Sequence, residues 1–181
     1  MQTLQARVVC QGPLSFPEAA RMTREIARQL SELHSLDQLF GTVRPEVVML
    51  LDDGEPRLKR NASGDPDEEV DYLAPERALA VKKPDPRSDL YSLGCTFYYL
   101  LTGRIPFPEG SIGERLLKHQ TESPPDLAEL CPGMPAELQQ LCSQLLAKRR
   151  DQRPQSARAV AKVLEQWLET SAAGEKVVQT A

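Results

Sequence analysis

The chain contains the stretch Leu73-Ala74-Pro75-Glu76, followed by Asp89-Leu90-Tyr91-Ser92-Leu93-Gly94 and, much later, by Gln152-Arg153-Pro154. The middle stretch belongs to a segment from about residue 87 to 102 whose apolar residues fall on every side of a helical wheel. Such a segment predicts a helix in the centre of a domain. Gly103, just after it, is a typical residue for ending a helix. We therefore expect the other elements to pack around this segment.

The sequence outside this helix predicts more helices and one hairpin. Ser15 as an N-cap and Pro17 in the first turn indicate a helix that begins near residue 16. Two short apolar runs joined by an Asp-Gly turn are typical of a hairpin, and they occupy residues 47–51 and 56–58. Further helices are predicted at about 111–121, 135–148 and 155–169.

The 181 residues fit one domain, because a chain of this length can bury a proper core. We expect that domain to occupy residues 15–169. Residues 1–14 are interpreted as a lead-in segment and residues 170–181 as a flexible tail. Residues 60–71 have few apolar side chains and several acids, which predicts a solvated loop.

Composition makes several partners and sites improbable. The net charge is −4 and the longest basic cluster is Lys148-Arg149-Arg150, so we expect no nucleic-acid partner. The sequence has no apolar run of the roughly 18–20 residues that span a bilayer and no opening like a signal peptide, so we expect no membrane partner and a cytoplasmic protein. The spacing of the four cysteines fits neither a zinc site nor a redox pair, so no metal site is predicted.

In this order and spacing the motifs resemble the C-terminal lobe of a bacterial-type Ser/Thr protein kinase. The family's Tyr-x-Ala-Pro-Glu, Asp-x-Tyr-Ser-x-Gly and Leu-Thr-Gly-x-x-Pro-Phe all fall between residues 71 and 107. The resemblance implies a mainly α fold, a kinase C-lobe with a short β-hairpin and without the N-lobe. It also implies that Glu76 pairs with Arg153 and that Asp89 accepts hydrogen bonds from the catalytic-loop backbone. The expected structural-motif residues are Ala74, Pro75, Glu76, Asp89, Gly94 and Arg153.

The resemblance aligns the family's catalytic loop with residues 40–47. It places Thr42 at the position of the aspartate base, Arg44 at that of the lysine and Val47 at that of the asparagine that binds Mg²⁺. Arg60 stands at the aspartate of the second metal-binding motif. Threonine has no suitable pKa for accepting the substrate's proton, and neither valine nor arginine coordinates a hard cation. These positions are therefore interpreted as degenerate.

From these substitutions we expect a catalytically inactive lobe, a pseudokinase that is not an enzyme and has no cofactor. It is similar in plan to kinase non-catalytic C-lobe domains, so a role as a protein-interaction or scaffold module is expected. Two alternatives stay open. In the first alternative, the chain is the C-terminal half of a split or atypical Ser/Thr kinase that binds ATP only with a separate N-lobe. In the second, it is a self-associating structural domain that forms a homodimer.

The face that an N-lobe would cover is the expected partner-binding surface. It should expose apolar side chains around 47–51 beside an acidic rim, and such a surface favours a basic partner segment. The competing interpretation is that the hairpin packs internally and the acids serve only solubility. The predicted rim consists of Asp52, Asp53, Glu55, Asp65, Asp67, Glu68 and Glu69.

Overall fold

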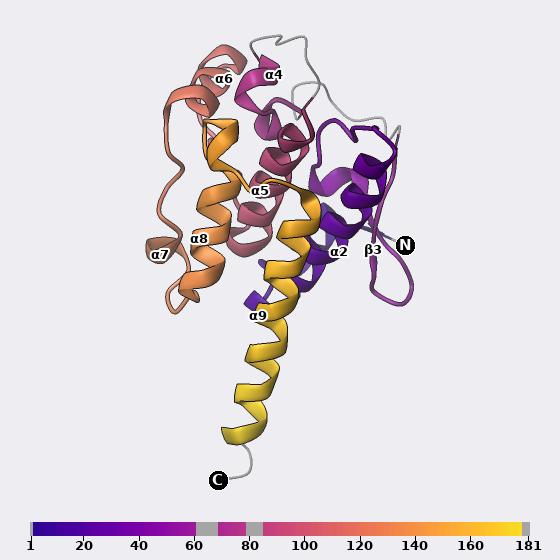
Figure 1. Ribbon diagram of the computed structural model, residues 1–181. Coiled ribbons are helices and arrows are strands. Elements are labelled where there is room, and N and C mark those ends of the chain that lie inside the picture. Colours follow the sequence, from indigo (N-terminus) through magenta and orange to yellow (C-terminus); the bar gives the residue numbers. More distant parts are fainter. Residues whose placement is uncertain (1, 61–68, 79–84, 179–181) are drawn as a thin grey trace.

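The computed structural model describes residues 2–60, 69–78 and 85–178. Over these residues the protein is mainly helical, with a small sheet at one side (Figure 1). The predicted mainly α fold with a short hairpin is confirmed. In chain order the elements are β1 (Gln2–Thr3), α1 (Leu4–Gln11), α2 (Phe16–Ser35), η1 (Pro45–Val47), β2 (Val48–Leu50), β3 (Pro56–Leu58), η2 (Val70–Tyr72), α4 (Pro75–Ala78), α5 (Pro86–Thr102), α6 (Ile112–Thr121), α7 (Leu127–Leu130), α8 (Ala136–Leu145), η3 (Arg150–Gln152) and α9 (Ala157–Val178).

Helix α5 lies in the centre of the fold, as its apolar sequence predicts. It is buried from Ser88 to Leu101 and packs against α2 and α8. Asp85 caps its start by accepting a hydrogen bond from the Arg87 N–H, and Gly103 ends it in the left-handed conformation with φ of 69°. The close contact with α8 depends on Gly94, since a Cβ there would lie 2.7 Å from the Cβ of Leu145.

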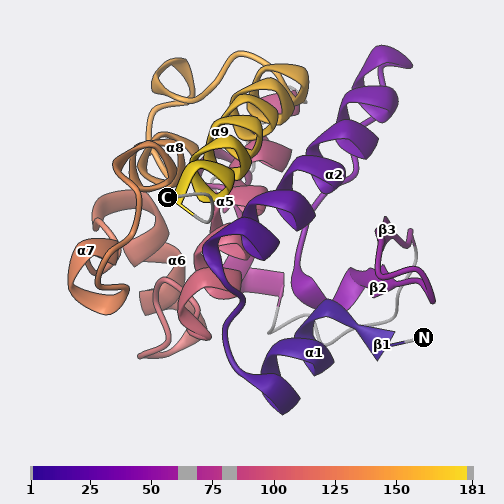
Figure 2. The same ribbon diagram turned by 90° about the horizontal axis from the view of Figure 1, so that it is seen from below.

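Helices α2 and α9 lie side by side along one flank of α5 (Figure 2). Helix α2 begins with a capping box in which Ser15 and Glu18 exchange hydrogen bonds with each other's backbone N–H groups. Arg28 of α2 and Glu165 of α9 form an ion pair between the two helices. In the part of the chain that is described, none of the helices is long and apolar enough to cross a membrane.

The sheet has the order β1-β2-β3, and both pairs are antiparallel. The predicted hairpin is its β2–β3 half, in which Met49 pairs with Arg57. Its third strand comes from residues that we interpreted as a lead-in. Strand β1 pairs with β2, and α1 follows it with Leu4 and Val8 buried in the core.

The ends of the chain therefore differ from the expected pattern. Residues 2–11 are built into the sheet and the core because Leu4 and Val8 share one helix face and Thr3 caps the helix. Helix α9 also continues to Val178, past the expected end at residue 169. The short helices α4 and α7 were not predicted, since each is only one turn long. The division into a lead-in, a domain and a tail stays a prediction.

Candidate functional site

The segment 40–47 is attached to the start of α5 by Asp89. The carboxylate of Asp89 accepts hydrogen bonds from the backbone N–H groups of Phe40, at 2.8 Å, and Gly41, at 3.0 Å. His34 Nε2 lies 2.9 Å from the same carboxylate. Asp89 is fully buried, and a buried carboxylate requires such partners. Asp89 thus has the scaffold contacts that the resemblance implied for it.

Two hydroxyl groups further along α5 fix the next part of the segment. Ser92 Oγ accepts a hydrogen bond from the Val43 N–H at 3.0 Å, and Thr96 Oγ1 donates one to the Val43 carbonyl at 2.9 Å. Asp89, Ser92 and Thr96 are spaced by three and four residues, so they share one face of the helix. The hydrogen bonds from that face fix the position of the segment along α5.

The segment borders a cavity of about 390 Å³ that contains all four positions interpreted as degenerate. It lies between the segment that follows α2, the end of β3 and the residue before η2. The site predicted from separate sequence motifs is therefore one place in the structure. Its lining residues are Leu39, Phe40, Thr42, Arg44, Val47, Lys59, Arg60 and Glu69.

A hydroxyl and a carboxylate meet at the catalytic-loop position. Thr42 Oγ1 donates a hydrogen bond to Glu69 Oε1 at 2.7 Å and accepts one from Arg77 at 3.2 Å. Among the described residues that line the cavity, Glu69 is the only acid. The chain thus places a carboxylate next to the residue that occupies the position of the family's base. From the sequence alone, we had assigned Glu69 to the predicted acidic rim.

The remaining polar residues of the cavity are cations. Arg44 is buried, Lys59 is exposed just after β3, and Arg60 donates a hydrogen bond to the Leu39 carbonyl at 3.1 Å. The Mg²⁺ that the family implies requires oxygen ligands, and Val47 and Arg60 supply none at the two aligned positions. Within residues 2–60, 69–78 and 85–178 no group of three His, Cys, Asp or Glu side chains could hold a metal. The described residues of this cavity do not fit Mg²⁺.

Glu76 of α4 and Arg153 form a bidentate ion pair, with N–O distances of 2.8 and 2.9 Å. Arg153 is almost fully buried and also donates hydrogen bonds to three backbone carbonyls. Ser88 Oγ donates a further hydrogen bond to Glu76 at 2.7 Å. Burial alone would raise the pKa of the Glu76 carboxyl, but the hydrogen bonds from Arg153 and Ser88 outweigh it, so the pKa lies below its ordinary value. The pair fixes α4 to the segment before α9.

The predicted partner-binding residues are only partly within the described residues. Asp52 and Asp53 are exposed in the turn between β2 and β3, and Glu55 is half-buried beside them. Asp65, Asp67 and Glu68 lie outside the described residues. Val47 and Val48 are buried, whereas residues 49–51 are half-buried, so the apolar run faces the core more than we expected.

Sequence reasoning missed several residues that build this region. His34 Nε2 contacts the carboxylate of Asp89, and this contact was not predicted from the sequence. Ser88 was not singled out and Ser92 was treated only as part of a motif. The hydroxyl group of Ser88 donates to Glu76, and that of Ser92 accepts from the backbone of residue 43. The spacing of Ser88, Asp89 and Ser92 along one helix is the signal that could have indicated these roles.

Comparison with known proteins gives the same family for almost the whole chain. The sequence model of the protein kinase domain matches residues 1–167. The DNA damage-responsive serine/threonine-protein kinase RqkA of Deinococcus radiodurans is 35% identical over 164 residues, which are 83% of this chain and 24% of that protein. The serine/threonine-protein kinase pkn2 of Myxococcus xanthus is 30% identical over 87% of this chain and 21% of its own length. This chain therefore spans less than a quarter of each of these two relatives.

These findings correct one prediction from the sequence. We expected a protein that is not an enzyme, but the matching family is the protein kinase domain and these relatives are named serine/threonine-protein kinases. The substitutions at Thr42, Val47 and Arg60 were read as a loss of activity, and the comparisons contradict that conclusion. The predicted resemblance itself is confirmed, and the chain belongs to the protein kinase domain family.

Proposed function

We propose that this chain works as the C-terminal lobe of a Ser/Thr protein kinase, and that its site is completed by a nucleotide-binding lobe from outside residues 1–181. One observation carries the proposal: the Thr42–Glu69 pair stands in a cavity of about 390 Å³ at the catalytic-loop position. The scaffold around it is the one that the family's motifs imply, with Asp89 and the Glu76–Arg153 pair in place.

Within this proposal Glu69 accepts the proton of the substrate hydroxyl, a task that requires a carboxylate or another base within hydrogen-bond reach. Its carboxylate already accepts a hydrogen bond from the Thr42 hydroxyl at 2.7 Å, so a substrate hydroxyl in the place of Thr42 Oγ1 would meet the same acceptor. Among the described lining residues, Arg44, Lys59 and Arg60 are three cations and Glu69 is one acid, a balance that favours phosphate oxygens. The proposed mechanism includes no step through Mg²⁺, because the cavity residues do not fit it.

The test joins the part of the Deinococcus kinase that precedes the matched region to residue 2 of this chain. The chimera is expected to transfer phosphate from ATP to a basic protein substrate, with the intact Deinococcus kinase as the positive control. Glu69→Gln in the chimera is expected to lower the rate by about 100-fold or more, because removing a general base costs at least two orders of magnitude. Phosphate incorporation is measured with labelled ATP.

The matched control is Glu137→Gln, which removes an exposed glutamate of α8 far from the cavity. It should leave the rate unchanged, and both variants should keep the melting temperature of the parent chimera. A folded chimera that transfers no phosphate contradicts the proposed function. A rate that is insensitive to Glu69→Gln contradicts the role of Glu69 alone.

A second candidate function, which does not exclude the first, is the docking of a basic protein segment beside the hairpin. We propose it because Asp52 and Asp53 are exposed in the β2–β3 turn next to the half-buried Leu50 and Leu51. A lysine-rich peptide is the probe, and its binding is measured by fluorescence anisotropy at low salt. Replacing both aspartates with asparagine is expected to weaken binding at least several-fold, since each lost opposite charge removes a favourable contact.

Unchanged peptide binding by the double asparagine variant contradicts this second candidate. Light scattering on the same samples reports the mass, so a homodimer is recognised in the same experiment. The asparagine side chains keep the size and the turn preference of aspartate, which makes a loss of folding a poor explanation for weaker binding.

A further inference from the structure

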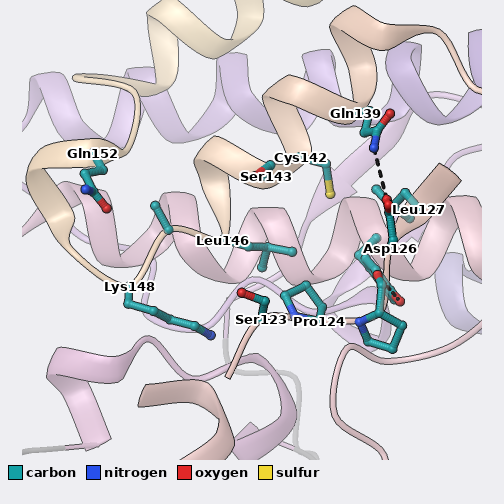
Figure 3. A pocket seen from close by; sticks show the side chains of 13 residues that line it. Ser123, Pro124, Asp126, Leu127, Gln139, Cys142, Ser143, Leu146, Lys148 and Gln152 are labelled. Carbon is teal, nitrogen blue, oxygen red and sulfur yellow. Dashed lines mark hydrogen bonds between the residues drawn. The ribbon is translucent and has the colours of Figure 1, made fainter. Parts of the chain in front are cut away.

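A second cavity has a volume of about 540 Å³ and shares no lining residue with the Thr42–Glu69 cavity. Residues 123–127, α5, α8 and the segment after α8 surround it (Figure 3). Lys148 lines this cavity together with Ser123 and Leu146, and its amine extends toward the side that Ser123 lines. The same lysine also lines a hollow of about 600 Å³. Lys148 thus borders two open spaces.

The amine of Lys148 is held against aromatic rings rather than by an acid. Its Nζ lies 4.8 Å from the centroid of the Phe107 ring and 5.7 Å from that of Tyr91. It also lies 3.4 Å from Tyr91 Oη. The ion pairs found among the described residues do not include Lys148. No acid of the described residues therefore lies within ion-pair distance of this half-buried amine, and the nearby charge that favours its protonated form acts from farther away.

Burial lowers the pKa of the Lys148 amine from its ordinary value to about 8. Cys95 and Glu122 act against this shift, and Arg153 adds to it. His119, whose ring packs on Phe107 and Tyr91, has its own pKa lowered to about 4 by burial, so it adds no charge near neutral pH. The titratable and charged groups around the amine come from several elements. They are Tyr91 and Cys95 from α5, His119 from α6, Glu122 after α6, Arg153 after η3, Asp126 in the 540 Å³ cavity, and Glu76, Arg87, Arg149, Arg150 and Asp151 around the hollow.

We propose that Lys148 is an acylation site, which takes a small activated acyl group from an acyl phosphate or an acyl thioester that enters the 540 Å³ cavity. The proposal rests on the placement of a half-buried amine at the edge of an open cavity, where no acid among the described residues lies within ion-pair distance of it. It is independent of the proposed kinase function, because none of these residues lines the Thr42–Glu69 cavity.

The reaction uses the neutral amine as the nucleophile. Its lone pair attacks the carbonyl carbon of the donor and forms a C–N bond, and the bond from that carbon to phosphate or thiolate breaks. The electron pair of the broken bond leaves with the phosphate or thiolate, and one proton of the nitrogen passes to water. The product is an amide, so Lys148 loses its positive charge without oxidation or reduction.

Acylation would act on the scaffold through Tyr91 and Arg153. The guanidinium of Arg153 lies 4.8 Å from the centroid of the Tyr91 ring, which Lys148 also approaches. Arg153 further donates a hydrogen bond to the Lys148 carbonyl at 3.1 Å while it pairs with Glu76. Removing the Lys148 charge therefore changes the surroundings of the ion pair that holds α4.

The test incubates the full chain with acetyl phosphate and, separately, with the thioester N,S-diacetylcysteamine, from pH 6 to pH 10. Peptide mass spectrometry measures the rate of acetylation at each lysine, and exposed Lys162 of α9 is the internal reference. Lys148 is expected to react several-fold faster than Lys162 at pH 8. Its rate should rise about tenfold per pH unit below pH 8 and level off above it, whereas an ordinary lysine with a pKa near 10.4 keeps rising. Lys148→Arg should remove only that product.

If the rate of Lys148 acetylation levels near pH 8 with both donors, the result supports a site that recognises the acyl group. If the rate levels with only one donor, that donor identifies the class of compound that the cavity admits. A Lys148 rate that stays below that of Lys162 at every pH with both donors overturns the proposal. A rate that rises steadily to pH 10 also overturns it, because the amine would then have no special reactivity. These outcomes do not depend on whether the chimera transfers phosphate.

Discussion

Replacing Arg153 with leucine is expected to lower the free energy of unfolding by about 3–5 kcal/mol, because it leaves the Glu76 carboxylate without its buried partner. The side chain of Arg153 has no solvent exposure. Its loss also removes the donor for the carbonyls of Ala147, Lys148 and Arg87. For a chain of this size the change corresponds to a fall in melting temperature of about 6–20 °C, which differential scanning calorimetry would measure.

Two further variants separate the ion pair from the loss of a long side chain. Arg158→Leu changes an exposed arginine of α9 and should leave the melting temperature nearly unchanged. Adding Glu76→Leu to Arg153→Leu should recover part of the lost stability, since no uncompensated charge then remains. If Arg153→Leu and Arg158→Leu melt at the same temperature, the pair does not hold α4 in place.

The helical frame could be predicted because its signals are local. The apolar sequence around Asp89 to Gly94 has one plausible placement, the centre of a helical domain, and α5 occupies it. The start of α2 followed from Ser15 and Pro17, and the structure adds the capping box with Glu18. Caps and periodic apolar faces depend on neighbours within four residues, which a single sequence contains.

The N-terminal segment could not be predicted for the opposite reason. Strand β1 has two residues, and its ladder is formed with residues 49 and 50. A strand of that length has no periodicity to detect. Only the pairing with β2, almost fifty residues away, identifies it, and the burial of Leu4 and Val8 then follows from that placement.

The candidate site was predicted as a set of positions and not as a set of chemical groups. Thr42, Arg44, Val47 and Arg60 were aligned through motifs, and the cavity brings all four together. Glu69 was assigned to a rim because it stands among other acids in the sequence. Its contact with Thr42 spans 27 residues, and such a contact is set by tertiary packing rather than by any local pattern.

Asp89→Ala is expected to be the second most damaging substitution, with a loss of about 2–5 kcal/mol in the free energy of unfolding. It removes the acceptor of two backbone N–H groups, those of Phe40 and Gly41, and each buried donor left without a partner costs about 1–3 kcal/mol. Because these donors belong to the segment that lines the 390 Å³ cavity, the variant should also release residues 40 and 41 from α5, whereas Ser92 and Thr96 still hold Val43.

Amide hydrogen exchange distinguishes that release from a general loss of stability. In Asp89→Ala, exchange should accelerate at Phe40 and Gly41 by more than it does at Val8 or Leu30, which are buried in the core elsewhere. Asp126→Ala is the matched control, because that exposed aspartate also accepts a backbone hydrogen bond, at the start of α7. Asp126→Ala should leave amide exchange unchanged both at Phe40 and Gly41 and at the core residues. Uniform acceleration across the core would mean that Asp89 supports the whole lobe and does not specifically hold the catalytic-loop segment. A carboxylate that orders only residues 40 and 41 would leave the amides of α1 and α2 protected.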